Sequence, residues 1–278
     1  MEVLLAKCAG ACYGVQRALK LARSQAENGV RAQTLGPLIH NPRVVQELSE
    51  QGISVAERVE DVNCDCVIVR SHGVTPEMMR DLESKAVRIV NATCPHVLKA
   101  QEAARELAKS CATVIIVGES SHPEVEGLRA HAQEAGGKVL VCESAADLPR
   151  GIAEPVGIVV QTTQSRNHLH ELCDALKQRG INPIVKDTIC SATGQRQREA
   201  AELASQVDAM VVIGGHNSAN TTRLFEICSE HAPRAFHVES AEELSPDLFE
   251  NCTKVGVTAG ASTPQEHIEY VVRLLEQW

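Results

Sequence analysis

The residue with the clearest chemical potential is Cys94, in the stretch NATCPHV (91–97). The run VRIV (87–90) before it predicts a strand, and VLKAQEAARELAK (97–109) after it predicts a helix. Pro95 fits the start of that helix, where proline is tolerated. A thiol between a strand end and a helix N-terminus lies in partial positive charge, which favours the thiolate.

The sequence builds this arrangement more than once. When Cys94 is aligned with Cys190 without gaps, QEAARELA (101–108) falls on QREAAELA (197–204). The same alignment pairs two further landmarks, Gly118 with Gly214 and Leu128 with Leu224. An agreement of this length indicates an internal repeat.

A third copy begins at Cys12, where the landmarks survive although the helix is less similar. Gly36 takes the place of Gly118, and the next equivalent positions hold His40, His122 and Ser218, followed by Pro42, Glu124 and Asn220. Each copy also carries a strand that ends in a small polar loop, namely RSHGV (70–74), QTTQS (161–165) and TAGAST (258–263).

Short β runs alternate with amphipathic helical patterns along the chain, which predicts an α/β fold with mainly parallel sheets. We expect three α/β units related by pseudo-threefold symmetry, at 1–93, 94–189 and 190–278. In such sheets ligands bind at the carboxyl ends of the strands, so three cysteines and six loops should converge on one central cavity. The predicted strands are VLLA (3–6), CVIVR (66–70), VRIV (87–90), TVIIVG (113–118), KVLVC (138–142), GIVVQ (157–161), PIVK (183–186), AMVVIG (209–214), AFHV (235–238) and KVGV (254–257).

Composition limits the class of partner. A net charge of −9 and 2% aromatic residues argue against nucleic-acid binding. No apolar run is long enough to span a bilayer and no signal peptide is recognisable, so we expect a cytoplasmic protein with no membrane partner. Eleven cysteines in such a chain indicate metal or redox chemistry rather than disulfides, although most should be small buried hydrophobic residues.

Three thiolates from three copies could hold zinc with an open site or an iron–sulfur cluster. Threefold convergence favours a [4Fe–4S] cluster, because three irons can be held by Cys12, Cys94 and Cys190 while the fourth stays open as a Lewis acid. The alternative is that the three cysteines are packing residues repeated at helix starts.

The loops of the three copies carry a hydrogen-bonding set without Lys or Arg. Several loops precede helices, where backbone N–H groups favour an anion, so the set suits a phosphate or diphosphate. Ordinary helix capping is the alternative for part of it. Glu124 is a candidate proton donor, whereas Glu126 is expected to face solvent or to pack as an acid at the helix start. The set comprises His40, Asn41, His72, His122, Glu124, Thr162, Thr163, Ser218, Asn220 and Ser262.

Nine motifs in order resemble one family, the 4-hydroxy-3-methylbut-2-enyl diphosphate reductases, which complete the methylerythritol phosphate route to isoprenoids. The resemblance covers essentially the whole chain. The motifs are GACYGVQRAL (10–19), IHN (39–41), SHGV (71–74), ATCP (92–95), HPEVEG (122–127), QTT (161–163), TIC.AT around Cys190, NSAN (217–220) and TAGAS (258–262).

This resemblance implies a three-lobed fold around one [4Fe–4S] cluster held by Cys12, Cys94 and Cys190. The implied reaction is a reductive dehydroxylation with two electrons, two protons and loss of water, giving isopentenyl and dimethylallyl diphosphate. Glu124 and Thr162 would deliver protons. A separate ferredoxin or flavodoxin would supply electrons, since the chain has no flavin or nicotinamide fingerprint. The implied substrate-binding residues are His40, His72, His122, Thr163, Ser218, Asn220 and Ser262.

Two departures from the family pattern and two rival functions follow. One departure is a surplus of cysteines, Cys8, Cys64 and Cys66 among them; Cys64 and Cys66 lie just before and within a predicted strand and should be structural. The other departure concerns the diphosphate loop. The family often has Ser-Ser-Asn where this chain has Ser218, Ala219 and Asn220, so one hydroxyl for the diphosphate is absent. A hydro-lyase would use the same open iron without an external reductant. A non-catalytic iron–sulfur or zinc sensor would have no need of Glu124.

Overall fold

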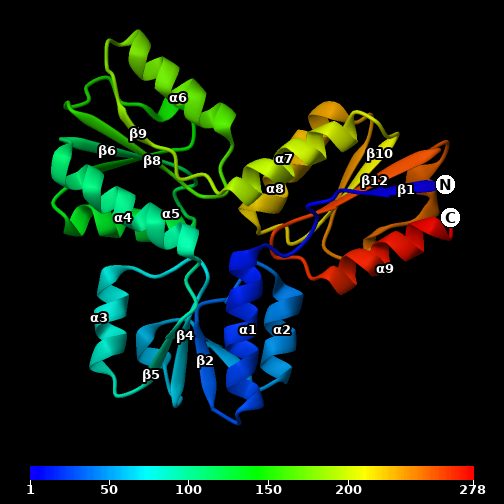
Figure 1. The fold of residues 1–278 in the computed structure, drawn as a ribbon, viewed down its shortest axis with the longest axis horizontal. Helices are drawn as coiled ribbons and strands as arrows, with labels where there is room; N and C mark the ends of the chain where they lie inside the picture. The colour runs from blue at the N-terminus through cyan, green and yellow to red at the C-terminus, as the bar shows by residue number, and fades with distance from the viewer. The chain divides into compact units, whose positions relative to one another are not determined.

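The computed structural model describes residues 1–278 and contains three four-stranded sheets with helices packed on them (Figure 1). The strand orders are β1-β12-β10-β11, β3-β2-β4-β5 and β7-β6-β8-β9, and all neighbouring strands are parallel. The α/β class with parallel sheets is therefore confirmed. The strands are β1 (Glu2–Leu5), β2 (Ala32–Leu35), β3 (Ile53–Ala56), β4 (Cys66–Val69), β5 (Arg88–Asn91), β6 (Thr113–Val117), β7 (Lys138–Cys142), β8 (Val156–Val160), β9 (Ile184–Lys186), β10 (Ala209–Ile213), β11 (Ala235–Val238) and β12 (Lys254–Ala259).

Nine α-helices connect and cover these strands. None of them combines the length and the hydrophobicity that a bilayer-spanning helix needs. The helices are α1 (Tyr13–Glu27), α2 (Pro42–Glu50), α3 (Pro76–Ser84), α4 (Pro95–Ser110), α5 (Pro123–Glu134), α6 (Arg166–Gln178), α7 (Ser191–Ala204), α8 (Ala219–His231) and α9 (Gln265–Glu276), with short 3-10 turns η1 (Val59–Asp61), η2 (Ala145–Asp147), η3 (Ala241–Glu243) and η4 (Pro246–Phe249).

The chain divides into two compact units. The first contains Met1–Gln16, His40–Val44 and Ser191–Trp278, and the second contains Arg17–Ile39 and Val45–Cys190. The first unit holds the sheet with β10 and the second holds the other two sheets. The N-terminal strand β1 pairs with β12, so the start of the chain completes the last sheet. The predicted boundaries at 1–93, 94–189 and 190–278 stay a prediction.

The sheet β7-β6-β8-β9 is buried on both faces, which explains why its central strands read as continuous apolar runs. Ile115 and Val117 point to one face and pack with residues of α6 such as Leu172. Val114 and Ile116 point to the other face and pack with α4 and α5. The period of two along β6 therefore places one sheet between two helix layers.

The sheet β1-β12-β10-β11 repeats this plan within the first unit. Val211 and Val257 pack with residues of α9 such as Ile268. Met210 and Val212 face the opposite side and pack with α7 and α8. The alternation along β10 thus matches that along β6, as expected for two copies of one repeat.

The sheet β3-β2-β4-β5 includes two strands that the apolar patterns did not reveal. These are β2, with the sequence AQTL, and β3, with ISVA. Both are four residues long, and β2 carries Gln33 and Thr34. A short strand with polar residues gives a weak periodic signal, although Gly36 directly after β2 marked its end.

Gly256 gives a test of the packing in the first unit. It lies in β12, and a Cβ there would stand 2.4 Å from the Sδ of Met210, which is fully buried. Gly256→Ala should therefore lower the free energy of unfolding by roughly 1–3 kcal/mol through overpacking. Urea unfolding measures this change.

The matched control is Gly151→Ala, because a Cβ at Gly151 meets no atom within 4 Å. That substitution should change stability little. Equal unfolding midpoints for Gly256→Ala and the unmodified protein would contradict the packing described for β10 and β12.

Candidate active site

Each of Cys12, Cys94 and Cys190 stands between an edge strand and a helix. The strands β1, β5 and β9 lie at the edges of their sheets, and α1, α4 and α7 begin directly after the three cysteines. Cys94 is the N-cap of α4, with Pro95 at the first helical position, as the sequence predicted. All three cysteines are partly exposed and none forms a disulfide.

The backbone holds the three cysteines in the same way. The N–H of Cys12 donates to the carbonyl of Ala261 at 3.1 Å, that of Cys94 to Ser71 at 2.9 Å, and that of Cys190 to Thr162 at 2.9 Å. Each acceptor is the second residue after a strand, namely after β12, β4 and β8 respectively. These strands neighbour β1, β5 and β9 in their sheets, so the repeat fixes each cysteine against a polar loop.

Most of the other cysteines serve packing. Six of the eleven cysteines are buried. Burial raises the pKa of Cys142 to about 11 and that of Cys228 to about 12, so these thiols stay protonated and apolar in character. The expectation that most cysteines, Cys64 and Cys66 among them, are small buried residues is confirmed.

Glu124 and Thr162 form a buried pair within the second unit. Glu124 is 1% exposed, in the first turn of α5. The backbone N–H of Thr162 donates to its Oε1 at 2.6 Å, and the Thr162 hydroxyl donates to its Oε2 at 2.9 Å. Glu126, two residues on, is exposed, as expected. The two carboxyls of this turn therefore lie in opposite environments.

Burial raises the pKa of Glu124 to about 7, although the two hydrogen bonds from Thr162 act to lower it. Desolvation wins because a carboxylate without a cationic partner loses its hydration when it is buried. A carboxyl with this pKa is partly protonated at neutral pH. It can therefore both donate a proton and regain one, which is the property required of a general acid.

One histidine caps the helix turn that carries this carboxyl, and a second histidine lies against the first. His122 is the N-cap of α5, and its Nδ1 accepts the backbone N–H of Glu124 at 3.1 Å. An accepting Nδ1 leaves Nε2 as the nitrogen that carries hydrogen in the neutral ring. The ring of His72 meets that of His122 edge to face, with centroids 5.5 Å apart.

In the first unit the predicted polar residues gather around another helix start and loop. The Nδ2 of Asn41 donates to the carbonyl of Ser262 at 2.9 Å, and the Ser262 hydroxyl donates to the carbonyl of His40 at 3.0 Å. Ser218 is the N-cap of α8, where its hydroxyl accepts the N–H of Thr221. Capping therefore explains Ser218 and Asn41 in part, as anticipated.

Capping does not explain Asn220. This residue is 5% exposed, in the first turn of α8, and neither its Oδ1 nor its Nδ2 has a hydrogen-bond partner. Buried polar groups in proteins are almost always paired. The amide is therefore suited to a polar ligand at the α8 N-terminus.

Sequence reasoning missed Gln161, which is 1% exposed. Its Oε1 accepts the N–H of Glu119 at 3.0 Å, and its Nε2 donates to the hydroxyl of Thr163 at 3.1 Å. A Cβ at Gly118 would stand 2.6 Å from this side chain, so glycine is required there. Gln161 thus joins the loop before α5 to the loop after β8, and its place in the motif QTTQS was the available signal.

The predicted site residues are divided between the two units. Cysteine thiolates are the ligands that iron–sulfur clusters prefer, and partly exposed cysteines at helix starts supply them beside favourable backbone dipoles. The three cysteines fit such a group in chemistry. The set in the second unit is His72, Cys94, His122, Glu124, Thr162, Thr163 and Cys190, and that in the first is Cys12, His40, Ser218, Asn220 and Ser262.

The fold is that of an α/β protein built from repeated parallel sheets, with cysteines at three helix starts and a buried carboxyl. A family model described as "LytB protein" matches residues 3–276, and the chain belongs to this family. LytB proteins are iron–sulfur enzymes.

Relatives in this family carry one name. The chain is 47% identical to the 4-hydroxy-3-methylbut-2-enyl diphosphate reductase of Geotalea uraniireducens, over 100% of this chain and 98% of that protein. It is 45% identical to the reductase of the same name from Geobacter metallireducens, over 100% of this chain and 98% of the relative.

Two solved structures of reductases are similar to this chain over almost its whole length. One, titled as (E)-4-hydroxy-3-methyl-but-2-enyl diphosphate reductase, the terminal enzyme of the non-mevalonate pathway, is 39% identical, covers 100% of both chains and has a TM-score of 0.73. The reductase structure from Plasmodium falciparum is 26% identical, covers 99% of this chain and 87% of that one, and has a TM-score of 0.90.

The raised pKa of Glu124 has a consequence for stability. An acid whose folded pKa is about 7 binds more protons in the folded state than in the unfolded state between pH 4.5 and 7. The free energy of unfolding should therefore fall by about 3 kcal/mol as pH rises through this window. Urea unfolding of protein without added iron, from pH 5 to 8, measures the fall.

The variant Glu124→Gln should lose this component of the pH dependence, because its amide does not titrate. Glu126→Gln is the matched control on the same helix turn and should keep the behaviour of the unmodified protein. A difference between Glu124→Gln and the unmodified protein that is constant from pH 5 to 8 would show that the carboxyl is not held neutral by burial.

Proposed function

We propose that this chain catalyses the reductive dehydroxylation of (E)-4-hydroxy-3-methylbut-2-enyl diphosphate. The products are isopentenyl and dimethylallyl diphosphate, and the reaction consumes two electrons and two protons and releases water. The names of the relatives and the structures support this assignment. The observation that carries it is the buried Glu124 carboxyl, with its pKa of about 7 and its hydrogen bonds from Thr162.

Cys12, Cys94 and Cys190 are proposed to hold one [4Fe–4S] cluster with an open fourth iron. When bound, such a cluster supplies electrons one at a time and Lewis acidity. The repeated backbone hydrogen bond at each of these cysteines supports the proposal, since it distinguishes them from the buried packing cysteines. Convergence of the three cysteines on one cavity is part of the proposal.

Glu124 and Thr162 are proposed to deliver the protons. A hydroxyl leaves far more readily as water than as hydroxide, so a proton at the substrate oxygen lowers the barrier. The Thr162 hydroxyl donates to the carboxylate form of Glu124 and can accept from its protonated form, which makes it a natural proton relay. An allylic fragment protonated at either end accounts for two products.

The diphosphate is proposed to bind His40, His72, His122, Ser218, Asn220 and Ser262, while Thr163 lines the cavity. Neutral imidazoles, hydroxyls and helix N-termini donate hydrogen bonds to an anion without a strong point charge. Asn220 supports this reading, because its buried amide has no partner within the protein. Ala219 beside it supplies no hydroxyl, which should cost modest affinity.

Electrons are proposed to come from a separate ferredoxin or flavodoxin. The cytoplasmic location expected from the sequence stays a prediction. Neither the identity of the electron donor nor the location of the protein affects the residue roles proposed above.

The proposed activity is tested by anaerobic oxidation of reduced methyl viologen with and without the substrate, using cluster-reconstituted protein. Dye oxidation should depend on the substrate. Glu124→Gln should lower kcat by at least about 100-fold, because a general acid contributes roughly 10²–10⁴. Iron and sulfide content should be unchanged in this variant, whereas Cys94→Ser should lose the cluster.

The matched control is again Glu126→Gln, which should keep the unmodified rate. Substrate-dependent turnover near the unmodified rate in Glu124→Gln would remove Glu124 from the chemistry. An intact cluster with no substrate-dependent dye oxidation would reject the reductase assignment.

Asn220→Ala tests the diphosphate site. One hydrogen bond to a charged group is worth roughly 1.5–3 kcal/mol, so substrate affinity should fall about tenfold or more. Asn217→Ala is the matched control, since Asn217 is exposed just before α8. Isothermal titration with inorganic diphosphate or substrate measures both. Equal affinities for the two variants would place the diphosphate elsewhere.

A further inference from the structure

The helix α7, which begins after Cys190, holds the backbone segment before Cys12 through side-chain hydrogen bonds. Arg196 lies on α7, the helix that begins after Cys190, and is 5% exposed. Its Nε donates to the carbonyl of Cys8 at 2.9 Å, and its Nη2 donates to the carbonyl of Gly10 at 2.8 Å. Both carbonyls lie in the short segment between β1 and Cys12, so one guanidinium bridges that segment.

A second side chain of α7 holds the same segment. Glu199, one turn after Arg196, accepts the backbone N–H of Cys8 at 2.8 Å and the Cys8 thiol at 3.3 Å. Gly10 adopts φ +98°, and a Cβ there would stand 2.8 Å from Ile268. Two side chains of α7 therefore fix the backbone segment that leads to Cys12. The positive φ of Gly10 and the close approach of Ile268 explain why this segment contains a glycine.

The same relation recurs one cysteine further along. Arg17 lies on α1, the helix that begins after Cys12. Its Nη1 donates to the carbonyl of Thr93 and its Nη2 to that of Asn91, each at 3.3 Å. These two carbonyls immediately precede Cys94. An arginine on the helix after one cysteine thus again bridges two carbonyls before the next cysteine.

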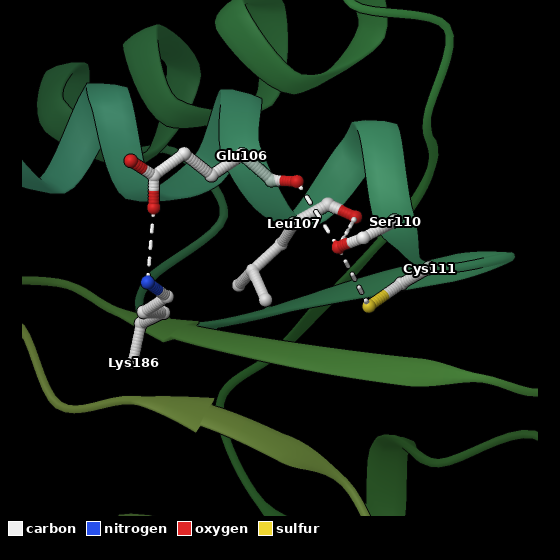
Figure 2. Close-up of polar contacts among 5 residues, drawn as sticks. All are labelled: Glu106, Leu107, Ser110, Cys111 and Lys186. Atoms are coloured by element: carbon white, nitrogen blue, oxygen red, sulfur yellow. Dashed lines mark hydrogen bonds and ion pairs between the residues drawn. The ribbon is translucent and has the colours of Figure 1, made fainter.

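The third helix, α4, contacts the strand before Cys190 through an ion pair between side chains, which is a weaker interaction. Glu106 lies on α4, which begins after Cys94, and its Oε2 pairs with the Nζ of Lys186 at 2.9 Å, at the end of β9 before Cys190 (Figure 2). The two side chains are 53% and 44% exposed. An ion pair this exposed contributes little, so the two arginines are the stronger members of the series.

We propose that Arg196 and Arg17 are positioning residues for the cluster ligands: each uses the helix that starts at one cysteine to fix the backbone of the next. This inference rests on the proposed function, because it assumes that the three cysteines bind one cluster. A cluster requires its three thiolates at set separations, and each arginine fixes the backbone segment that leads to one of them.

Arginine suits this role better than lysine. Its planar fork presents several N–H donors at fixed angles, so it can hold two carbonyls at once, whereas an ammonium on a flexible stem holds them less rigidly. The fork of Arg196 is also buried, where donors to carbonyls are not replaced by water once the side chain is removed. Loss of Arg196 should therefore loosen the backbone segment that carries Cys12, and should not merely alter the protein surface.

The test is the rate of iron release from the reconstituted protein to a chelator under anaerobic conditions. Residues that support metal ligands typically change metal affinity 10–100-fold when substituted, so Arg196→Gln should release iron roughly tenfold faster or more. Arg196→Lys should release iron at a rate between those of Arg196→Gln and the unmodified protein. Arg198→Gln is the matched control, because Arg198 is exposed on the same helix, and should release iron at the unmodified rate.

Arg17→Gln separates positioning from general stability. Arg17 is only partly buried, so its loss should leave the unfolding temperature of the cluster-free protein nearly unchanged while iron release accelerates. If circular dichroism shows that Arg196→Gln does not fold, Arg17→Gln decides alone. Iron release at the unmodified rate in the folded variants would overturn the inference and leave the proposed function intact. An unmodified protein that binds no cluster would overturn both.

Discussion

At Cys12, Cys94 and Cys190 one backbone N–H donates to a carbonyl two residues beyond the neighbouring strand, and the rest of the site depends on this hydrogen bond. It exists because each cysteine follows an edge strand that is parallel to its neighbour, so that both strands end at the same edge of the sheet. The loop that accepts the bond also carries site residues, such as Thr162 beside Cys190 and Ser262 beside Cys12. The same bond therefore fixes the position of each cysteine relative to the polar loop.

The raised pKa of Glu124 follows from the lack of a lysine or arginine beside it. Glu124 is buried without a cationic partner, and the hydrogen bonds from Thr162 only partly offset the loss of hydration, so its pKa rises to about 7. A lysine or arginine at this position would have paired with the carboxyl and held it ionised. In the proposed function, histidines, hydroxyls and helix starts would bind an anion and would leave the acid able to hold a proton. The proposed anion recognition and proton delivery are thus compatible with each other.

Much of this arrangement could be predicted from the sequence, because the repeat carried it. Cys94 with Pro95, the glycines at strand ends and the parallel α/β class all follow from local patterns. The repeat separated Glu124 from Glu126 as the candidate acid, but the near-complete burial of Glu124 involves contact with Thr162 far along the chain, which the motif HPEVEG does not encode. Strand β2 was hidden by its polar residues. The pairing of β1 with β12 and the grip of Arg196 on the Cys12 segment are long-range contacts that no local period encodes.

The proposed chemistry requires that Cys12, Cys94 and Cys190 hold one iron–sulfur cluster with an open iron. Mössbauer spectroscopy of protein reconstituted with ⁵⁷Fe examines this requirement at the iron atoms themselves. Ligation by three cysteines should give a [4Fe–4S] signal in which one iron differs from the other three and changes when the substrate is added. A cluster with four equivalent irons that ignores the substrate, or no cluster at all, would contradict it.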